Sequence, residues 1–500
     1  MPYRVTGVSP ICVALGSATP RELVALACRE AERGEEFFEF RLDLLEKPRT
    51  GAGAIREFLA AHGECVVVAT CRRREAGGQF RGSVAEQLEI LQEAARAGAR
   101  FVDVEIETAA AAPKQLPSLG AELIVSYHNF TSTPALEAVL ERLRKIPASA
   151  YKIAATARKP SDWWRVLSLV RRHRDVRLIA LAMGEGGIPS RVLGPAFGAL
   201  FTYAAPHGGD GTAPGQIPTD ELRKLYRAGK LSRASRVYGV IADPVAHSLS
   251  PVVHNRAFQV RRLDAVYLPF RVAPAHLRDF MTVAEQLPVA GFSVTIPHKQ
   301  RILRYLNAVD PLARRIGAVN TVWRKAGRWR GTNADVDGVL EPLKRRIRLH
   351  GASVLVAGSG GAARSAAFAL ADAGARVSVT GRTPARVQAL ARACGGEALD
   401  RAATQEREFD VLVHATPLGM FPHTEECFFP DRIPAALVFD MVYNPAETLL
   451  IRKARDQGKQ VICGLEMFLE QAARQFEIWT GESAPRSVMA RAAEEALARS

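Results

Sequence analysis

The 500-residue sequence has few cysteines and lacks any paired cysteine motif. Its seven cysteines are odd in number and scattered, with no Cys-x-x-Cys pair. This pattern argues against a disulfide framework or a zinc site, so we expect no bound metal. It favours a reducing, cytoplasmic environment.

Long apolar runs are also missing. The most apolar stretch, residues 178–205, is interrupted by Glu185, Pro189, Arg191 and Pro195. A membrane-crossing helix needs about 20 consecutive apolar residues, so no transmembrane segment is expected. Residues 1–10 lack a basic region followed by an apolar one, so no signal peptide is expected.

Lysine is scarce in a chain that is otherwise basic. Lys and Arg number 67 against 52 Asp and Glu, a net charge of +15, yet 12 of the 67 are Lys. The arginines are spread along the chain rather than gathered in a basic arm. This distribution favours small anionic ligands over nucleic acid or a membrane surface. The sequence leaves open whether the chain is a monomer or a homodimer.

What the first half does contain is an alternation of apolar runs and helical patterns. Eight short runs lie near residues 10–15, 36–43, 65–71, 100–105, 122–127, 149–155, 177–183 and 197–203. Helical patterns separate most of them, as at 134–146 and 83–98, where Ser83 and Glu86 have capping-box spacing. Eight strand–helix units within about 230 residues predict a closed (β/α)8 TIM barrel.

The polar stretch 229–236 predicts a domain boundary after the barrel. The expected domains of this α/β protein are a TIM barrel over 1–230, a smaller α/β domain over 236–338, a Rossmann domain over 339–464 and C-terminal helices over 465–500. We expect the first of these helices near residues 465–479.

Polar residues stand at the expected carboxyl ends of the barrel strands, where TIM barrels carry their chemistry. They are Glu39 and Arg41 on the second run, Arg72 after the third, His128 after the fifth, Lys152 within the sixth, Arg191 after the seventh and Gln216 after the eighth.

Lys152 and His128 point most directly to a reaction. Lys152 lies in an apolar run, and burial disfavours the charged form of an amine. A neutral amine can form a Schiff base with a ketone, and a histidine can remove a proton beside that imine. Either residue alone would more often be structural. On neighbouring strands, they predict a lyase.

The segment 353–363 predicts a dinucleotide-binding turn. A buried strand runs into glycines with GxGxxA spacing, and a helix over 362–373 follows. The next strand, 376–380, is followed by Gly381, Arg382 and Thr383, with Arg386 close behind, rather than by an acidic residue. Arginine matches a 2′-phosphate, so NADP is favoured. The alternative is a surface arginine in an Arg-rich chain.

Two further residue pairs are candidates in the second half. Lys299, held by Asp335, could supply a proton to a carbonyl that is reduced by hydride. From spacing alone, a surface salt bridge is the better interpretation. Ser248 and Ser250 could donate to a ligand carboxylate, or could form a turn or a helix N-cap.

These motifs carry a family resemblance over nearly the whole chain. The first half resembles type I 3-dehydroquinate dehydratase, through Glu39-Phe-Arg41-Leu-Asp43, Thr70-Cys-Arg72, Asp103-Val-Glu105, Ser126-Tyr-His128-Asn-Phe130, Tyr151-Lys152-Ile, Ser190-Arg191 and Ala213-Pro-Gly-Gln216. The second half resembles shikimate dehydrogenase, through Ser248-Leu-Ser250-Pro, Val294-Thr295-Ile-Pro-His-Lys299, Gly317-Ala-Val-Asn320-Thr, Asn333-Ala-Asp335, the Gly358 turn, Ala415-Thr416-Pro-Leu-Gly-Met420, Asp440-Met-Val-Tyr443-Asn-Pro and Gly464-Leu-Glu-Met-Phe-Leu-Glu-Gln471.

For the barrel, the resemblance implies an imine between Lys152 and the ketone of 3-dehydroquinate. His128 would remove the adjacent proton and then assist loss of the hydroxyl. The residues implied to hold the substrate's carboxylate and hydroxyls are Glu39, Arg41, Arg72, Arg191, Thr212 and Gln216. In the family, a glutamate in Glu-Gly-Gly orients the histidine. Here the sequence reads Glu75-Ala76-Gly77-Gly78, with the acid one place early.

For the second half, the resemblance implies that Lys299 and Asp335 serve the carbonyl that undergoes hydride transfer. The implied substrate-binding residues are Ser248 and Ser250 for the carboxylate, with Thr295, Asn320, Tyr443 and Gln471 on ring hydroxyls or nearby. The implied NADP-binding residues are Gly358, Gly360, Gly361, Ala362, Arg382, Thr383, Arg386, Thr416 and Gly464. The departures are Ser293, Gly381 and His414, each in place of the usual asparagine, and Ala334 in place of threonine.

The sequence therefore predicts a bifunctional shikimate-pathway enzyme. Its barrel would dehydrate 3-dehydroquinate to 3-dehydroshikimate, and its second half would reduce that product to shikimate with NADPH. A quinate-oxidising variant of the same folds is the nearest alternative. A non-catalytic regulator is the other, but such a protein would be expected to lose its imine-forming lysine or its proton-transfer pair, which this chain keeps.

Overall fold

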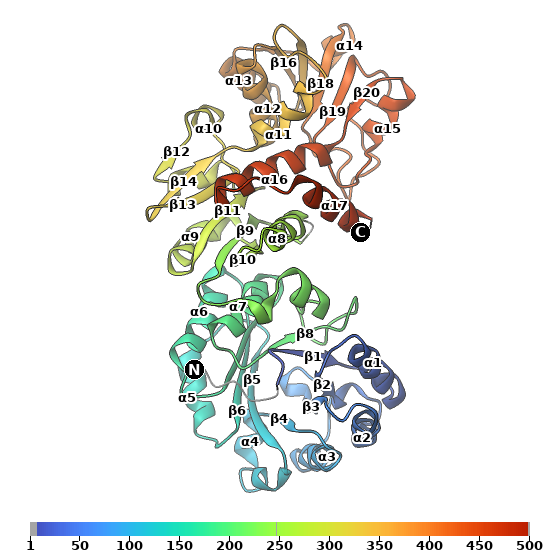
Figure 1. The fold of residues 1–500 in the computed structure, drawn as a ribbon, viewed down its shortest axis with the longest axis vertical. Helices are drawn as coiled ribbons and strands as arrows, with labels where there is room; N and C mark the ends of the chain where they lie inside the picture. The colour runs from blue at the N-terminus through green and yellow to red at the C-terminus, as the bar shows by residue number, and fades with distance from the viewer. Residues whose placement is uncertain (1–7, 247, 499–500) are drawn as a thin grey trace. The chain divides into compact units, whose positions relative to one another are not determined.

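The computed structural model describes residues 8–246 and 248–498 (Figure 1). Residues 1–7 and 499–500 of the expected terminal domains lie outside the described residues, as does His247 beside Ser248. The chain forms two compact units. The first runs to residue 236 and also includes residues 244–246 and 264–288, and the second holds most of the remainder.

The first unit contains a parallel barrel, with strands in the order β7-β6-β5-β4-β3-β2-β1-β8. The strands are β1 (Ile11–Leu15), β2 (Phe37–Arg41), β3 (Val66–Thr70), β4 (Phe101–Glu105), β5 (Glu122–Asn129), β6 (Ala150–Thr156), β7 (Leu178–Met183) and β8 (Thr202–Ala204). The helices are α1 (Pro20–Glu32), α2 (Gly51–Ala61), α3 (Val84–Arg96), α4 (Ile106–Ala111), α5 (Leu136–Arg144), α6 (Pro160–Arg172) and α7 (Ile188–Phe197). The same unit includes β10 (Ala265–Arg271) and α9 (Leu277–Gln286).

The barrel is nearly rather than fully closed. Among the described residues no ladder joins β7 to β8, and the N–H of Leu200 donates to the carbonyl of Leu178 at 2.9 Å instead. The prediction of the first seven strands is confirmed to within two residues at each end. The prediction of the eighth, at 197–203, is wrong at its start because α7 continues to Phe197 and ends at left-handed Gly198.

Strand alternation explains why the barrel holds both a core and a site. Phe37, Glu39 and Arg41 share one face of β2, since side chains alternate along a strand. Phe37 packs edge-on against Phe201, with ring centroids 4.8 Å apart, and also contacts Phe101. These aromatic rings fill the barrel interior on the amino-terminal side of Glu39 and Arg41. The predicted capping box is also confirmed, since Ser83 Oγ accepts from Glu86 N–H and Glu86 accepts from Ser83 N–H.

In the second unit, β9 (Arg236–Ala242), β11 (Val289–Val294), β13 (Thr321–Lys325), β14 (Arg328–Thr332) and β12 (Ala308–Val309) are consecutive in one sheet. The helices of this region are α8 (Ser250–Val260), α10 (Pro311–Ile316) and α11 (Asp335–Lys344).

A second, wholly parallel sheet of this unit has the order β17-β16-β15-β18-β19-β20. Its strands are β15 (Ser353–Ala357), β16 (Arg376–Thr380), β17 (Glu397–Ala398), β18 (Phe409–His414), β19 (Ala435–Asp440) and β20 (Gln460–Ile462). The helices are α12 (Gly361–Asp372), α13 (Pro384–Cys394), α14 (Arg401–Gln405), α15 (Leu449–Asp456), α16 (Gly464–Thr480) and α17 (Arg486–Leu497).

Strand order reverses between β15 and β18. In such sheets ligands bind beyond the carboxyl ends of the strands at that switch point. The predicted strand–turn–helix over 353–373 and strand 376–380 are confirmed, and α16 matches the expected helix to within one residue. Within the described part of the chain, every helix is too short or too polar to span a bilayer.

Candidate functional site

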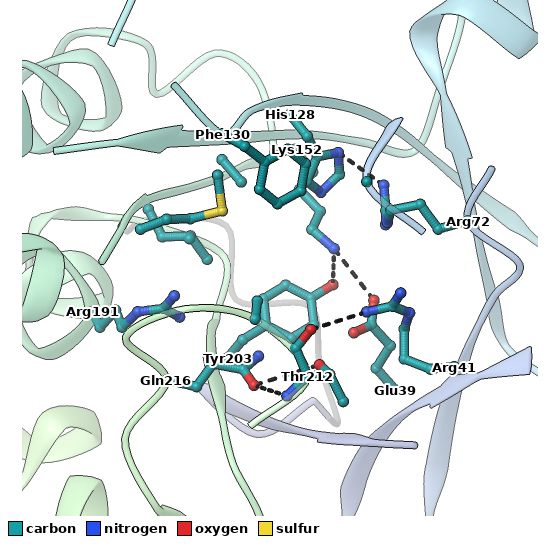
Figure 2. Close-up of a pocket in the computed structure, with 15 residues that line it drawn as sticks. Glu39, Arg41, Arg72, His128, Phe130, Lys152, Arg191, Tyr203, Thr212 and Gln216 are labelled. Atoms are coloured by element: carbon teal, nitrogen blue, oxygen red, sulfur yellow. Dashed lines mark hydrogen bonds and ion pairs between the residues drawn. The ribbon is translucent and has the colours of Figure 1, made fainter. Parts of the chain in front are cut away.

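One pocket in the barrel gathers every barrel residue that the sequence singled out (Figure 2). These are Glu39, Arg41, Arg72, His128, Lys152, Arg191, Thr212 and Gln216. They come from β2, β5, β6, α7 and the segments after β3 and β8, so the strand–helix repeat brings them together. His128 lies within β5 rather than after it, because the strand runs on to Asn129.

Lys152 is buried, with 6% of its side chain exposed, but it is not in an apolar environment. Its Nζ lies 2.9 Å from Asp103 Oδ2 and 3.3 Å from Glu39 Oε1. Two carboxylates stabilise an ammonium, which opposes the effect of burial. The apolar surroundings that its neighbours in the chain led us to expect are therefore absent around Nζ. Nζ attacks a ketone only as the free amine.

Asp103 and Tyr203 contact Lys152, although the sequence analysis assigned a role to neither residue. The Tyr203 hydroxyl accepts from Nζ at 3.0 Å, and the ammonium lies 4.1 Å from the centre of the tyrosine ring. Asp103 also accepts from Arg72 and Ser126, and the Arg72 and Lys152 charges hold its pKa far below the usual range against the effect of burial. Asp103 lies in the middle of an apolar run of the sequence, and a buried charge needs a partner. This position could have indicated that Asp103 pairs with a cation inside the barrel.

His128 has an arginine as its partner, not a carboxylate. Arg72 Nη1 donates to His128 Nδ1 at 2.8 Å. An arginine has no acceptor, so Nδ1 must carry a lone pair, and the neutral ring has its proton on Nε2. Burial, and then the Arg72 and Lys152 charges, lower the pKa of His128 well below its usual value.

The displaced acid does not reach the histidine. The side chain of Glu75 is 74% exposed and pairs with Arg73 at 3.3 Å. Phe130 instead covers His128, with the two rings nearly parallel at 15° and 6.2 Å between centroids. The orienting role implied for a glutamate in this loop therefore has no counterpart at Glu75.

The three arginines of the pocket differ in how many donors they have free. Arg41 forks onto Asp43, with contacts of 2.9 and 2.7 Å, and Arg72 is held by Asp103, Ser126 and His128. Arg191 is 1% exposed, and its Nε and Nη1 have no hydrogen-bond partner among the described residues. Burial lowers its pKa to about 10. A buried cation with free donors is a site for an anion, and guanidinium binds carboxylate in two-pronged fashion.

The segment after β8 places two further polar groups beside these arginines. Gln216 Oε1 accepts from the backbone N–H of Thr212 at 2.7 Å, which folds the loop on itself. The carbonyl of Thr212 accepts a long bond, 3.5 Å, from Arg41. The free amide nitrogen of Gln216 and the Thr212 hydroxyl line the pocket (Figure 2).

The second unit joins four of its predicted residues in one hydrogen-bonded chain. Lys299 Nζ contacts Asp335 Oδ2 at 2.5 Å, and Asn320 donates to the other Asp335 oxygen at 2.8 Å and to Gln471 Oε1 at 3.4 Å. Asp335 has 4% of its side chain exposed and Lys299 has 17%. The pair is thus mostly buried, unlike the surface salt bridge that spacing alone favoured.

The other predicted substrate residues lie on separate elements of this unit. Ser250 is the buried first residue of α8, and its N–H donates to Ser248 Oγ at 3.3 Å. This hydrogen bond closes a turn, which was the structural alternative to carboxylate binding that the sequence left open for the two serines. Thr295 follows β11, and Tyr443 follows β19 and packs on Phe468, with centroids 4.9 Å apart. Ser293 donates to Gln475 at 2.8 Å, and Ala334 N–H donates to Asn320. These two residues, which differ from the family pattern, are therefore both hydrogen-bonded to polar side chains of the same unit.

The glycine turn has a shape that fits a dinucleotide. Gly358 has φ +130°, and a Cβ there would lie 2.7 Å from the Ala415 carbonyl. A Cβ on Gly361 would lie 3.5 Å from Lys299 Cδ, which places the turn beside the Lys299–Asp335 pair. Gly360 caps α12, with Ala362 in its first turn. Gly464 begins α16 against Val442, where a Cβ would be 2.3 Å from the carbonyl.

Arg382, Thr383 and Arg386 are exposed after β16, where a 2′-phosphate would be bound. Neither arginine forms an ion pair with another described residue, so both guanidinium groups keep their donors for a ligand. Thr416 follows β18, on the other side of the switch point.

Comparison with known proteins agrees with the families that the two halves of the sequence resemble. The family of type I 3-dehydroquinase matches residues 11–233. Three shikimate dehydrogenase models follow: the substrate binding domain at 240–322, shikimate / quinate 5-dehydrogenase at 342–421 and the C-terminal domain at 464–494. A chloroplastic bifunctional 3-dehydroquinate dehydratase/shikimate dehydrogenase of Arabidopsis thaliana is 34% identical over 97% of this chain and 84% of its own length.

The chain belongs to the bifunctional 3-dehydroquinate dehydratase/shikimate dehydrogenase family. A shikimate dehydrogenase (NADP+) of Thermosynechococcus vestitus is 41% identical and covers 54% of this chain and 98% of its own length. A shikimate dehydrogenase crystallised with NADP+ superposes with a TM-score of 0.51 at 34% identity, covering 53% of this chain and 97% of its own. The family assignment confirms the predicted fold and activity class, while the roles of single residues stay predictions.

Proposed function

We propose that this family member dehydrates 3-dehydroquinate through an imine on Lys152 and reduces the resulting 3-dehydroshikimate to shikimate with NADPH. The observation that carries the first step is a buried amine beside a histidine, in a pocket that also holds Arg191, whose Nε and Nη1 have no hydrogen-bond partner among the described residues. The substrate is an anionic ketone. Arg191 in this pocket suits its carboxylate, and Lys152 suits its ketone.

The pocket supports a stepwise elimination. The substrate carboxylate pairs with Arg191, while Lys152 loses a proton and attacks the ketone carbon. Water leaves and an imine forms, which makes the neighbouring C–H acidic because the nitrogen withdraws electrons. His128 takes that proton and returns it to the β-hydroxyl, which departs as water. Hydrolysis of the imine then frees the enone product and restores Lys152.

His128 must change state for this role. Its Nδ1 lone pair is engaged by Arg72, and its Nε2 bears the proton. If bound substrate moved either the His128 ring or the Arg72 guanidinium, the hydrogen bond between them would break. The Nδ1 lone pair could then accept a proton. Arg72 is fixed by Asp103 and Ser126, so the ring is the partner more free to move.

The second unit is suited to carbonyl reduction. The Gly358 turn leaves backbone room for a pyrophosphate, and Arg382 and Arg386 have free donors for a 2′-phosphate. When bound, NADPH supplies the hydride. Lys299 donates a proton to the carbonyl oxygen as it gains charge, and Asp335 holds that ammonium in place. Asn320 donates to Asp335 and to Gln471, and these two amides are the groups assigned to ring hydroxyls of the substrate.

We further propose that the chain works in the cytoplasm as a monomer or homodimer, with the four domains bounded as the sequence predicts. All seven cysteines are free thiols, which supports a reducing compartment. Mass photometry of the purified chain would distinguish the two oligomeric states.

One assay tests both activities. Purified chain supplied with 3-dehydroquinate and NADPH alone should oxidise the NADPH after a lag, because the second reaction needs the product of the first. Lys152→Ala should abolish this signal but keep oxidation with 3-dehydroshikimate. Asp335→Asn should lose oxidation while still producing the absorbance of the conjugated enone. NADPH oxidation by Lys152→Ala with 3-dehydroquinate would contradict the assignment of the barrel.

Quinate remains to be compared as a substrate of the second unit. The serine pair at 248 and 250 and the free Arg382 favour shikimate with NADP. We expect kcat/KM for shikimate oxidation to exceed that for quinate, and steady-state rates with each would show a reversed ratio if the quinate alternative holds.

A further inference from the structure

A buried histidine–aspartate pair lies beneath the loop that follows β18, and the proposed reaction does not use it. His414 and Asp440 are the last residues of β18 and β19, with 1% and 0% of their side chains exposed. His414 Nδ1 lies 2.9 Å from Asp440 Oδ1, and Nε2 lies 2.5 Å from Thr416 Oγ1. The family resemblance implies asparagine at the position of His414.

The contacts of Asp440 determine the proton on His414 Nδ1. Asp440 accepts from Val442 N–H at 3.0 Å and from the Thr448 hydroxyl at 2.5 Å. Thr448 Oγ1 itself accepts from Ile451 N–H as the N-cap of α15, so its own proton points to Asp440. A carboxylate that accepts at both oxygens is ionised, and His414 must therefore donate through Nδ1–H.

The other ring nitrogen of His414, Nε2, is hydrogen-bonded to the Thr416 hydroxyl. A hydroxyl has one donor and two acceptor positions, and one of the latter is taken by Leu418 N–H at 3.3 Å. When His414 is neutral, Nε2 takes the Thr416 proton and leaves the oxygen as an acceptor for a ligand. When His414 is protonated, Nε2–H takes the remaining lone pair and leaves the Thr416 O–H as a donor.

Thr416 lies where its hydroxyl, as donor or as acceptor, would face a ligand. It follows the strand beside the switch point, and the carbonyl of Ala415 just before it lies against the Gly358 turn. It is partly exposed, whereas His414 is not. The crevice at such a switch point is where a dinucleotide binds. A hydroxyl donor there suits the phosphate oxygens of an anionic cofactor, and an acceptor does not.

We propose that His414 is a proton-linked positioning residue for the NADP site: its protonation turns the Thr416 hydroxyl outward as a donor and tightens cofactor binding. The inference rests on the proposed function, which places Thr416 at the cofactor. Asp440 is the charged group in contact with the ring, and the ring of Phe428 packs beside it at 6.1 Å between centroids.

The other titratable groups near this pair are thiols. Cys427 and Cys463 each have a pKa raised mainly by burial, with the Asp440 charge contributing. Arg401 and Lys453 act on Cys427, and Arg455, Glu447 and Glu466 act on Cys463. Neutral thiols leave His414 as the titratable side chain that is hydrogen-bonded to both Asp440 and Thr416.

The test is calorimetric titration of the full chain with NADP+ between about pH 5.5 and 8.5, a range that brackets the ordinary titration of histidine side chains. From low to high pH, the dissociation constant of the wild type should rise by a factor about 3 to 10 times larger than that of His414→Asn. This factor corresponds to the loss of one hydrogen bond. Comparing the two proteins cancels the titration of the 2′-phosphate itself. Titrations in buffers of different ionisation enthalpy should show a larger proton uptake on binding for the wild type.

Thr416→Val supplies the second variant. It should lose the same extra pH dependence, because the hydroxyl that carries it is gone, and Thr416→Ser should keep it. Equal pH dependence in wild type and His414→Asn, or its persistence in Thr416→Val, would overturn the inference. Failure of the wild type to bind NADP+ at any pH would instead refute the cofactor assignment on which it rests.

Discussion

Arg72 donates a hydrogen bond to Nδ1 of His128, where the family resemblance had led us to expect a carboxylate. The two partners have opposite effects on the ring. A carboxylate favours the charged imidazolium, whereas a guanidinium disfavours it. The histidine of this barrel is therefore held neutral, with its Nε2 proton directed away from Arg72.

The first prediction concerns pH. Because the folded-state pKa of His128 lies below its usual value of 6.5, the ring stays neutral as the pH falls through that value. Dehydratase kcat/KM should show no acidic limb at about pH 6.5, the ordinary histidine value. The same depression means that the native state binds fewer protons than the unfolded one, so stability falls as pH drops below 6.5. A pH–rate profile with a midpoint near 6.5 that is absent in His128→Gln would contradict this.

Glu75 should be dispensable for dehydration. Its side chain faces solvent and pairs with Arg73, so Glu75→Gln should leave dehydratase kcat within about twofold of wild type. His128→Gln is the matched comparison and should lose about 100-fold or more, the usual size of a general-base contribution. Measured with 3-dehydroquinate, a large loss in Glu75→Gln would show that the loop closes onto the histidine during turnover.

Arg191 should favour binding at the expense of stability. It is a buried cation with two nitrogens unpartnered, so Arg191→Met removes an uncompensated charge and should raise the melting temperature of the barrel transition. The same change should raise KM for 3-dehydroquinate at least about tenfold, since a charge-assisted hydrogen bond to the carboxylate is lost. Calorimetry and steady-state kinetics measure the two effects. A lower melting temperature with unchanged KM would mean that Arg191 is structural.

Tyr203 should assist Lys152 through its hydroxyl, which accepts from Nζ at 3.0 Å. Tyr203→Phe should slow dehydration about 3- to 10-fold, the value of one hydrogen bond. Tyr151→Phe is the control on the adjacent position to Lys152. Its hydroxyl donates to the carbonyl of Ile146 and does not line the pocket, so its rate should not change. Equal rates in both variants would remove Tyr203 from the account.

Asp335 should matter for reduction alone. Asp335→Asn weakens the hold on Lys299 and should lower dehydrogenase kcat about 100-fold with no change in the barrel reaction. Asp337 lies on the same helix but faces Arg474 at 3.7 Å and is 42% exposed. Asp337→Asn should therefore be silent, and a comparable loss in both variants would indicate damage to α11.

The sequence predicted the barrel because its strands are buried on both faces and so appear as short apolar runs. It predicted the pocket residues because side chains at the ends of parallel strands converge. It did not predict the start of β8, because Phe197 ends α7 and the strand begins only at Thr202. The difference depends on how α7 packs, which periodicity in a short run does not show.

Charge pairing was the other feature that the sequence could not supply. The apolar neighbours of Lys152 in the chain suggested apolar surroundings, but Asp103 and Glu39 come from other strands and contact it through the barrel interior. Likewise, nothing in the spacing showed that Arg72 rather than Glu75 would meet His128, or that His414 would join Asp440 to Thr416. Each depends on the directions of side chains from separate elements.

Borohydride trapping followed by peptide mapping tests the central claim most directly. Reduction of the chain in the presence of 3-dehydroquinate should inactivate the dehydratase and leave one stable adduct, on the peptide that carries Lys152. Dehydrogenase activity should survive, since Lys299 is held by Asp335 and lies in the second unit. An adduct on another lysine, or full turnover without any trapped adduct, would contradict the imine mechanism.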